Sequence, residues 1–185
     1  DTGHDPDPIT RDPISGQRYF PNEEGDILGE AQWEWLKREL RTSTAQVHLI
    51  GTSIQAVSSQ HPWAKCANFP QARERLFRVI DASGVPGAVL LNGDRHISEL
   101  SRHDEAAGDP LYEFTSGGLT HHAPVHEAAN RHRVGPLVAA LNYGLVTIDW
   151  AADPVTLRFE VRGTDNETLL DHTLSLSALR PSGGS

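Results

Sequence analysis

The sequence contains no methionine, a single cysteine (Cys66) and no run of about 18 apolar residues. One cysteine excludes an internal disulfide and a zinc site built from several cysteines. Without a long apolar run, no membrane-spanning helix is expected. Acidic residues outnumber basic ones, which gives a formal net charge of −9. Because a surface of that sign repels a phosphate backbone, we do not expect nucleic acid to be the main partner.

The sequence also lacks the short motifs of several large enzyme classes. It has no G-x-G-x-x-G, no G-x-x-x-x-G-K-[ST], no H-E-x-x-H and no G-x-S-x-G pattern. These absences argue against Rossmann dinucleotide enzymes, P-loop nucleotidases, zincins and α/β-hydrolases.

What is present is the composition of a globular domain, with 37% hydrophobic residues in a chain of 185. That length predicts one domain, over residues 1–180, followed by a disordered tail at 181–185. Residues 1–26 are expected to form an irregular arm, because their Asp-Pro pairs disfavour helix. Since the chain begins with Asp1 and has no methionine, we expect it to be cut from a longer protein.

Hydrophobic periodicity predicts a β-α-β unit after a first helix. The helix is expected over 29–41, with one apolar stripe made of Leu28, Ala31, Trp35, Leu36 and Leu40. Strands at 45–51 and 87–91 flank a second helix, which begins at Pro70 and ends before Gly84. A strand-helix-strand order predicts that the two strands are parallel.

Beyond residue 97 the pattern predicts β structure. Two strands are expected at 97–102 and 111–115, followed by a glycine- and histidine-rich loop at 116–135. Three further segments alternate in polarity and predict an antiparallel meander: 143–150, 155–161 and 168–176. The sequence therefore predicts an α/β fold, with a β-α-β unit followed by a β meander.

The turn after the predicted strand at 87–91 carries the most informative residues, Asp94, Arg95 and His96. In open α/β sheets, catalytic and binding groups gather at the carboxyl ends of parallel strands. A carboxylate and an imidazole two residues apart form half of a metal site, and Arg95 has the forked geometry that binds phosphate oxygens. The spacing alone does not decide between this interpretation and a polar turn with a solvated histidine.

A second candidate is the loop at 115–122, where two glycines, hydroxyl side chains and paired histidines have the chemistry to bind an anion. Its composition fits a flexible surface loop better. The other chemically capable residues are expected to be packed or solvated rather than functional: His48, His61, Trp63, Cys66, His126 and His132.

Taken together, these motifs resemble the PhoD-like alkaline phosphatases of the metallophosphoesterase superfamily. The resemblance extends from residue 26 to 150 in the order of that family. It rests on residues 26–36, 48–51, Ala67-Asn68-Phe69-Pro70 with Arg73, Arg75 and Leu76 behind it, residues 84–87, 93–96, 115–121 and 142–144.

The resemblance implies an α/β sandwich with two central sheets and hydrolysis of phosphomonoesters or phosphodiesters. It implies a centre of two divalent or trivalent metal ions, which are iron and calcium in some relatives. Asp94 and His96 are then metal ligands, and Arg95 and His121 lie in or near the substrate pocket. The resemblance also favours an exported protein, either periplasmic or extracellular.

The family places most of its metal ligands in the first half of the domain, and no such segment precedes Asp1. We therefore expect the C-terminal part of the catalytic domain, with little or no activity on its own. Three alternatives stay open: pairing with a separate N-terminal half, self-association through exposed sheet edges, and a non-catalytic β-rich binding or structural module.

Overall fold

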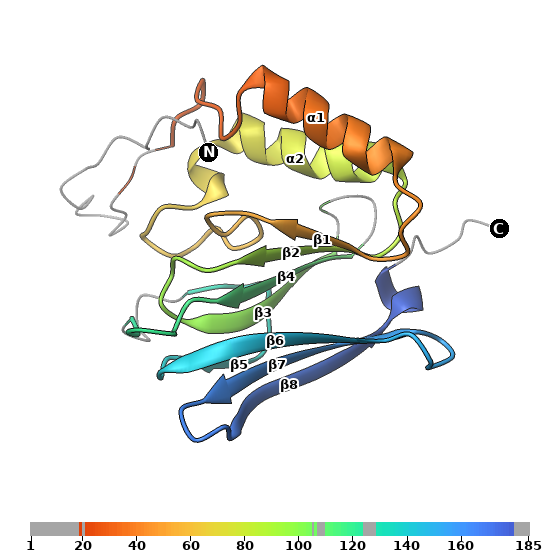
Figure 1. Ribbon diagram of the computed structural model, residues 1–185. Helices are drawn as coiled ribbons and strands as arrows, with labels where there is room; N and C mark the ends of the chain where they lie inside the picture. The colour runs from red at the N-terminus through yellow and green to blue at the C-terminus, as the bar shows by residue number, and fades with distance from the viewer. Residues whose placement is uncertain (1–18, 20, 105, 107–109, 124–128, 180–185) are drawn as a thin grey trace.

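The computed structural model describes residues 19, 21–104, 106, 110–123 and 129–179. In this part of the chain the elements form three layers, with helices above a five-stranded sheet and a three-stranded sheet beneath it (Figure 1). The predicted α/β fold with two sheets is confirmed. The predicted arm at 1–26 lies mostly outside the described residues, and the predicted tail at 181–185 lies wholly outside them.

Helix α1 (Glu30–Thr42) lies within one residue of its predicted bounds, and its buried face agrees with the predicted stripe at Leu36 and Leu40 but not at Trp35. The buried residues are Trp33, Leu36 and Leu40, whereas Trp35 is 54% exposed. Two positions along a helix turn the side chain by about 200°, so only one of the two tryptophans can face the core. Trp33 faces the core on the same side as Leu36 and Leu40, and its indole N–H donates to the Asp26 carboxylate at 2.8 Å.

The β-α-β unit is confirmed. Strand β1 (His48–Gly51) and strand β2 (Ala88–Asn92) pair in parallel, and helix α2 (Pro70–Ser83) connects them. Pro70 occupies the first turn of α2, and Gly84 ends the helix with a left-handed φ of 63°. Within the described ranges, no helix has the length and apolar character needed to cross a membrane.

The five-stranded sheet has the order β1-β2-β4-β3-β5. Strand β4 (Leu111–Ser116) continues the parallel pairing beyond β2, while β3 (Ser98–His103) runs antiparallel to both of its neighbours. Strand β5 (Arg133–Val138) was not predicted, and the predicted loop at 116–135 is wrong at its end. Gly135 and Pro136 explain the wrong prediction, because both residue types are typical of loops. In strands they are tolerated mainly at edges and bulges, and β5 is an edge strand.

The predicted meander is confirmed as β6 (Asn142–Asp149), β7 (Thr156–Gly163) and β8 (Thr168–Ser175), paired antiparallel in that order. A short 3-10 helix, η3 (Leu176–Leu179), follows β8. On β7, alternate residues Leu157, Phe159 and Val161 are fully buried against the five-stranded sheet.

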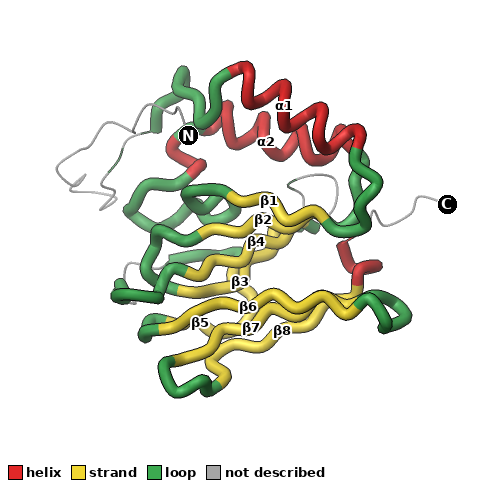
Figure 2. The backbone as a smooth tube through the Cα atoms, viewed as in Figure 1, coloured by secondary structure: helices red, strands yellow, loops and turns green. Residues whose placement is uncertain are grey.

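Two hydrophobic layers result, one on each face of the five-stranded sheet. Figure 2 shows the helices on one side of this sheet and the three-stranded sheet on the other. Neighbouring residues of β2 serve different layers: Leu90 packs beneath the helices, and Val89 packs against the three-stranded sheet. A strand buried on both faces has a continuous apolar sequence, which explains the run over residues 87–91.

Two buried carboxylates anchor the loop that follows β1. Glu113 on β4 accepts hydrogen bonds from the backbone N–H groups of Ala56 and Val57, at 2.6 and 3.1 Å. Complete burial raises the pKa of Glu113 to about 7, because desolvation disfavours the charged carboxylate.

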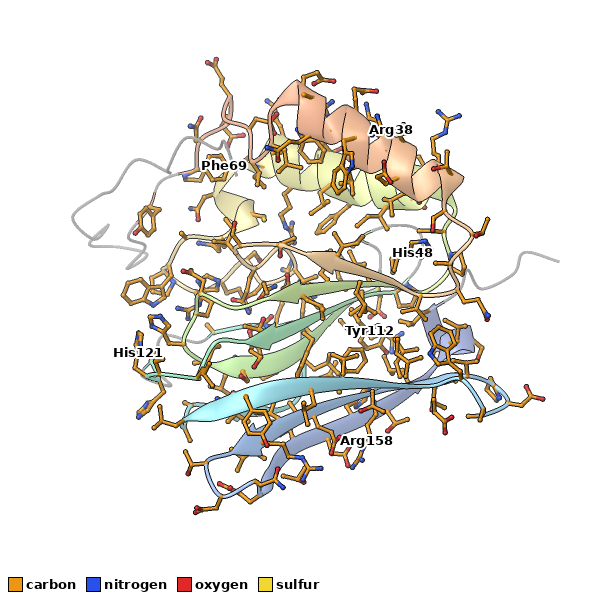
Figure 3. The ribbon with its side chains drawn as sticks, viewed as in Figure 1. Arg38, His48, Phe69, Tyr112, His121 and Arg158 are labelled. Atoms are coloured by element: carbon orange, nitrogen blue, oxygen red, sulfur yellow. The ribbon has the colours of Figure 1, made fainter. Side chains whose placement is uncertain are left out.

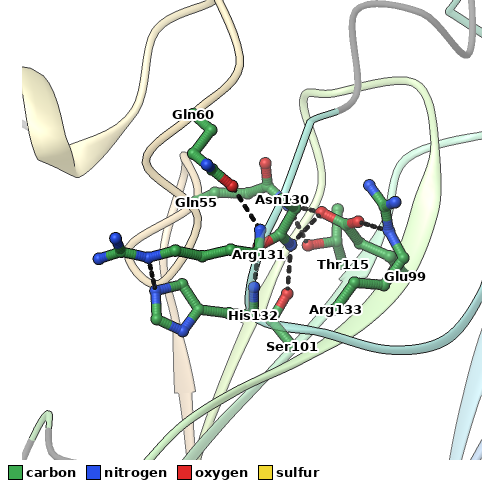
Figure 4. A network of polar contacts seen from close by, with 9 residues as sticks. All are labelled: Gln55, Gln60, Glu99, Ser101, Thr115, Asn130, Arg131, His132 and Arg133. Carbon is green, nitrogen blue, oxygen red and sulfur yellow. Dashed lines mark hydrogen bonds and ion pairs between the residues drawn. The ribbon is translucent and has the colours of Figure 1, made fainter.

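Glu99 on β3 is the second anchor, and Figure 4 shows the contacts around it. Its carboxylate accepts hydrogen bonds from the Gln55 and Asn130 side-chain amides at 2.8 and 2.9 Å, and forms an ion pair with Arg133 at 2.6 Å. The loop after β1 and the segment before β5 are therefore joined through one buried carboxylate.

The two tryptophans of α1 provide a test of the observed helix face. Trp33→Phe removes a hydrogen bond to a carboxylate and part of a buried ring, so it should lower the free energy of unfolding by about 1–3 kcal/mol. Trp35→Phe, on the exposed face, should change it by about 0.5 kcal/mol or less. Urea unfolding of both variants checks this, and a larger loss at Trp35 would contradict the helix orientation.

The raised pKa of Glu113 predicts a pH dependence. The folded chain binds this proton with a pKa of about 7 and the unfolded chain with a value near 4.5, so the contribution to stability is full below pH 4.5 and is lost as the pH rises through 7. Between pH 5 and 8, the unfolding free energy of the wild type should fall by about 2–3 kcal/mol relative to Glu113→Gln. Parallel pH profiles of the two proteins would rule this contribution out.

Candidate active site

The three parallel strands bring three loops to one edge of the five-stranded sheet. Strands β1, β2 and β4 all end on the same side, and the loops at 52–65, 93–97 and 117–123 follow them (Figure 1). Backbone hydrogen bonds join the second loop to the third, from Gly117 N–H to the Ile97 carbonyl at 3.0 Å and from Ala123 N–H to the His96 carbonyl at 2.8 Å. This is the edge at which open α/β sheets hold their ligands.

The turn after β2 is tight and strained. The Arg95 N–H donates to the Gly93 carbonyl at 2.6 Å, and this closes a three-residue turn around Asp94. Asp94 and His96 both adopt left-handed φ angles, of 57° and 54°. Such angles are uncommon away from glycine and gather at functional positions, where the surrounding structure holds them in place.

The side chains of this turn differ in burial, with Asp94 and His96 at the surface and Arg95 inside. Asp94 is exposed and His96 is half-buried, whereas Arg95 is buried and places its guanidinium 5.8 Å from the centre of the Trp63 ring. The turn therefore presents a carboxylate and an imidazole at the edge, and directs the arginine beneath the loop that follows β1.

The structure brings His121 to His96. Their ring centres are 3.7 Å apart, and the Thr120 hydroxyl lies 2.9 Å from His121 Nδ1. His121 itself is exposed at this edge (Figure 3). The close approach of the two loops requires a glycine at 117, because a Cβ there would lie 2.9 Å from the His96 backbone nitrogen.

The donor types at this edge match one side of a metal site. Asp94 offers a carboxylate and His96 an imidazole, which suit a divalent or trivalent ion. Among the described residues, however, no group of three or more histidine, cysteine, aspartate or glutamate side chains is arranged to hold a metal ion.

Several other residues singled out from the sequence have packing roles. His48 begins β1, at the edge opposite the three loops; its Nδ1 donates to the Pro86 carbonyl, and its Nε2 lies 2.9 Å from the Ser43 hydroxyl. Cys66 is buried, as expected, and burial raises the pKa of its thiol to about 12, so a reactive thiolate is disfavoured.

His132 packs away from this site. His132, predicted to be solvated, is half-buried, and its ring stacks on that of His103 with centres 4.5 Å apart. His126 lies outside the described residues.

Lys65 is the residue at this edge that sequence reasoning missed. Lys65 and His61 are 2% and 1% exposed, beside buried Arg95. Burial first, and then the positive charge of Arg95, lower the pKa of Lys65 to about 8 and that of His61 to about 2. A lysine within an irregular loop gives no sequence pattern that marks it as buried, so only the fold identifies this cluster.

Comparison with known proteins supports the resemblance seen in the sequence. Residues 9–156 match the family model described as PhoD-like phosphatase. Alkaline phosphatase D of Bacillus subtilis (strain 168) is 30% identical over 100 residues, which represent 48% of this chain and 16% of that protein.

A solved structure titled "Structure of PhoD" superposes on this chain with a TM-score of 0.60 and 18% identity, over 90% of this chain and 38% of that one. The chain thus spans well under half the length of these relatives. Because the family model covers most of its residues, the chain belongs to the PhoD-like phosphatase family.

Proposed function

We propose that this chain supplies one side of the active site of a metal-dependent phosphoric ester hydrolase that acts on phosphomonoesters or phosphodiesters. The observation that carries the proposal is the strained turn over residues 93–96, which presents Asp94 and His96 beside His121 at the carboxyl edge of the parallel strands. Membership of the PhoD-like phosphatase family supports phosphoester hydrolysis at the level of the family.

In this proposal Asp94 and His96 hold metal, and the other ligands come from outside the described residues. Bound metal ions would supply Lewis-acid activation of water and of the phosphate group. The part of the chain described here fixes the direction of the two ligands. His121 packs against the His96 ring, and the short turn around Asp94 holds its carboxylate towards solvent.

Backbone strain at this turn favours a functional role over a structural one. A residue other than glycine in the left-handed region costs about 1–2 kcal/mol. Asp94 is exposed, so packing of its side chain contributes little to offset that cost. A turn retained for stability alone would be better served by glycine at 94.

The outer edge of β1 supports a further part of the proposal. β1 is an edge strand of a parallel sheet, and among the described residues none pairs with its outer side. A largely apolar groove of about 600 Å³ lies between α1 and β1, lined in part by the exposed side chains of Trp35 and Leu49. Parallel sheets are normally covered, and an open apolar edge is a site for strand pairing.

We assign this groove to a strand from the part of the PhoD-like domain that lies outside this chain. The chain superposes over 90% of its own length on a PhoD structure but covers 38% of that structure, so there is ample polypeptide for this role. The same assembly would bring the remaining metal ligands to Asp94 and His96.

The ligand assignment predicts the behaviour of the purified chain. Alone, after dialysis, it should retain little metal and hydrolyse p-nitrophenyl phosphate slowly or not at all. Adding the rest of the domain should restore metal binding and turnover, and Asp94→Asn should then lower kcat/KM at least a hundredfold. Elemental analysis and a colorimetric assay measure both.

The matched control for Asp94 is Asp81→Asn, on the exposed face of α2, which should leave turnover unchanged. Robust turnover by the chain alone would contradict the incomplete ligand set. An assembled protein whose activity survives Asp94→Asn would contradict the role given to Asp94. An assembly without metal or activity would favour the non-catalytic alternative.

The groove assignment is tested with two equally exposed tryptophans. Trp35→Glu places a charge in the groove and should raise the dissociation constant for the rest of the domain at least tenfold, which is about 1.4 kcal/mol. Trp150→Glu, on a residue 55% exposed near the three-stranded sheet, should change it less than twofold. Calorimetric titration measures both constants, and equal effects of the two variants would place the contact elsewhere.

A further inference from the structure

The loop that follows β1 buries a histidine and a lysine beside Arg95 of the candidate ligand turn. His61, Lys65 and Arg95 are 1%, 2% and 3% exposed. Trp63 connects them: the Lys65 ammonium donates to its carbonyl at 3.3 Å, and the Arg95 guanidinium lies 5.8 Å from its ring centre. Arg95 is flanked in sequence by Asp94 and His96, so the cluster adjoins the turn that carries both.

His61 leaves one buried donor unused. Its Nδ1 accepts a hydrogen bond from the Trp63 backbone N–H at 3.2 Å, so the proton of the neutral ring resides on Nε2. Nε2 is buried and has no hydrogen-bond partner. A buried donor without an acceptor is costly, and such positions are filled by a ligand or water in working sites.

Lys65 is buried with a carbonyl, and no carboxylate, as its hydrogen-bond acceptor among the described residues. The two buried carboxylates of this region are engaged elsewhere, Glu113 by backbone N–H groups and Glu99 by Arg133 and the Gln55 amide. A buried ammonium normally has a paired negative charge. The lowered pKa of Lys65 agrees with an uncompensated charge.

We propose that His61, Lys65 and Arg95 form a phosphate-binding cluster at the edge of the proposed active site. A tetrahedral dianion supplies the acceptor that the His61 Nε2–H lacks and the negative charge that Lys65 lacks, and the Arg95 guanidinium adds a positive charge close to both. The identification of the anion as phosphate rests on the proposed function.

The chain between the two buried loop residues is less buried than they are. Residues 62–64, between His61 and Lys65, are half-buried, and Gln60 before them is exposed. The loop is anchored to the sheet on the N-terminal side of this segment, where Ala56 and Gln55 contact Glu113 and Glu99. In this proposal, phosphate reaches the cluster through residues 62–64.

The test uses the whole chain freed of metal with a chelator, so that no turnover occurs. Thermal unfolding is followed with increasing inorganic phosphate and, separately, p-nitrophenyl phosphate, against chloride at equal ionic strength. Both phosphates should raise the melting temperature of the wild type. If p-nitrophenyl phosphate raises the melting temperature at a lower concentration than inorganic phosphate does, the natural ligand of the cluster is a phosphate ester substrate rather than free phosphate.

Lys65→Met should abolish at least nine-tenths of the phosphate-induced shift, and should leave the phosphate-free protein as stable as the wild type or more so, because the buried charge is gone. Lys65→Arg should retain the shift. Lys37→Met is the control, on a lysine of α1 that pairs with Glu34. An unchanged phosphate effect in Lys65→Met, or none in the wild type, overturns the proposal.

A second measurement needs no variant. In the ¹⁵N spectrum of the wild-type chain, the His61 Nε2 resonance should move on phosphate titration, and an unmoved resonance at saturating phosphate overturns the proposal. The outcomes also separate this inference from the proposed function. If the chain binds phosphate but the completed domain shows no turnover, the phosphate-binding cluster is supported and the proposed function is contradicted. If the completed domain turns over but phosphate has no effect on the wild-type chain, only the phosphate-binding cluster is contradicted.

Discussion

Parallel pairing of β2 with β1 on one side and β4 on the other is the constraint on which the rest of this structure depends. It requires both faces of the sheet to be covered, which the helices and the three-stranded sheet accomplish. It also places the loops after all three strands at one edge. The same pairing therefore creates the two hydrophobic layers and the place where chemistry gathers.

Buried polar contacts then fix those loops. Glu113 and Glu99 are costly to bury, yet both are satisfied by donors from the loop after β1 or the segment before β5. The close fit of Gly117 against the His96 backbone locks the loop after β4 to the turn after β2. These contacts hold the loops at the carboxyl ends of β1, β2 and β4 in fixed positions, as expected for a preorganised site.

The site is one-sided. Among the described residues, no group of three or more metal-ligating side chains surrounds Asp94 and His96. The outer edge of β1, on the side away from β2, borders an apolar groove. Beneath the same turn, Lys65 and His61 lie buried next to Arg95. We propose one explanation for these features: another part of the domain supplies the covering strand and further ligands, and phosphate binds beside this turn.

The sequence by itself determined the α/β class, the β-α-β unit, the meander and the location of the key turn, because hydrophobic period and glycine or proline punctuation are local properties. It did not identify β5, whose Gly135 and Pro136 are typical of loops, nor choose Trp33 over Trp35. The sequence identified Asp94 and His96 as candidate site residues, but it did not predict which side chains they contact. Only the tertiary structure placed His121 on His96 and buried Lys65 beside Arg95, because these contacts join loops that are distant in sequence and meet only once the parallel strands are paired.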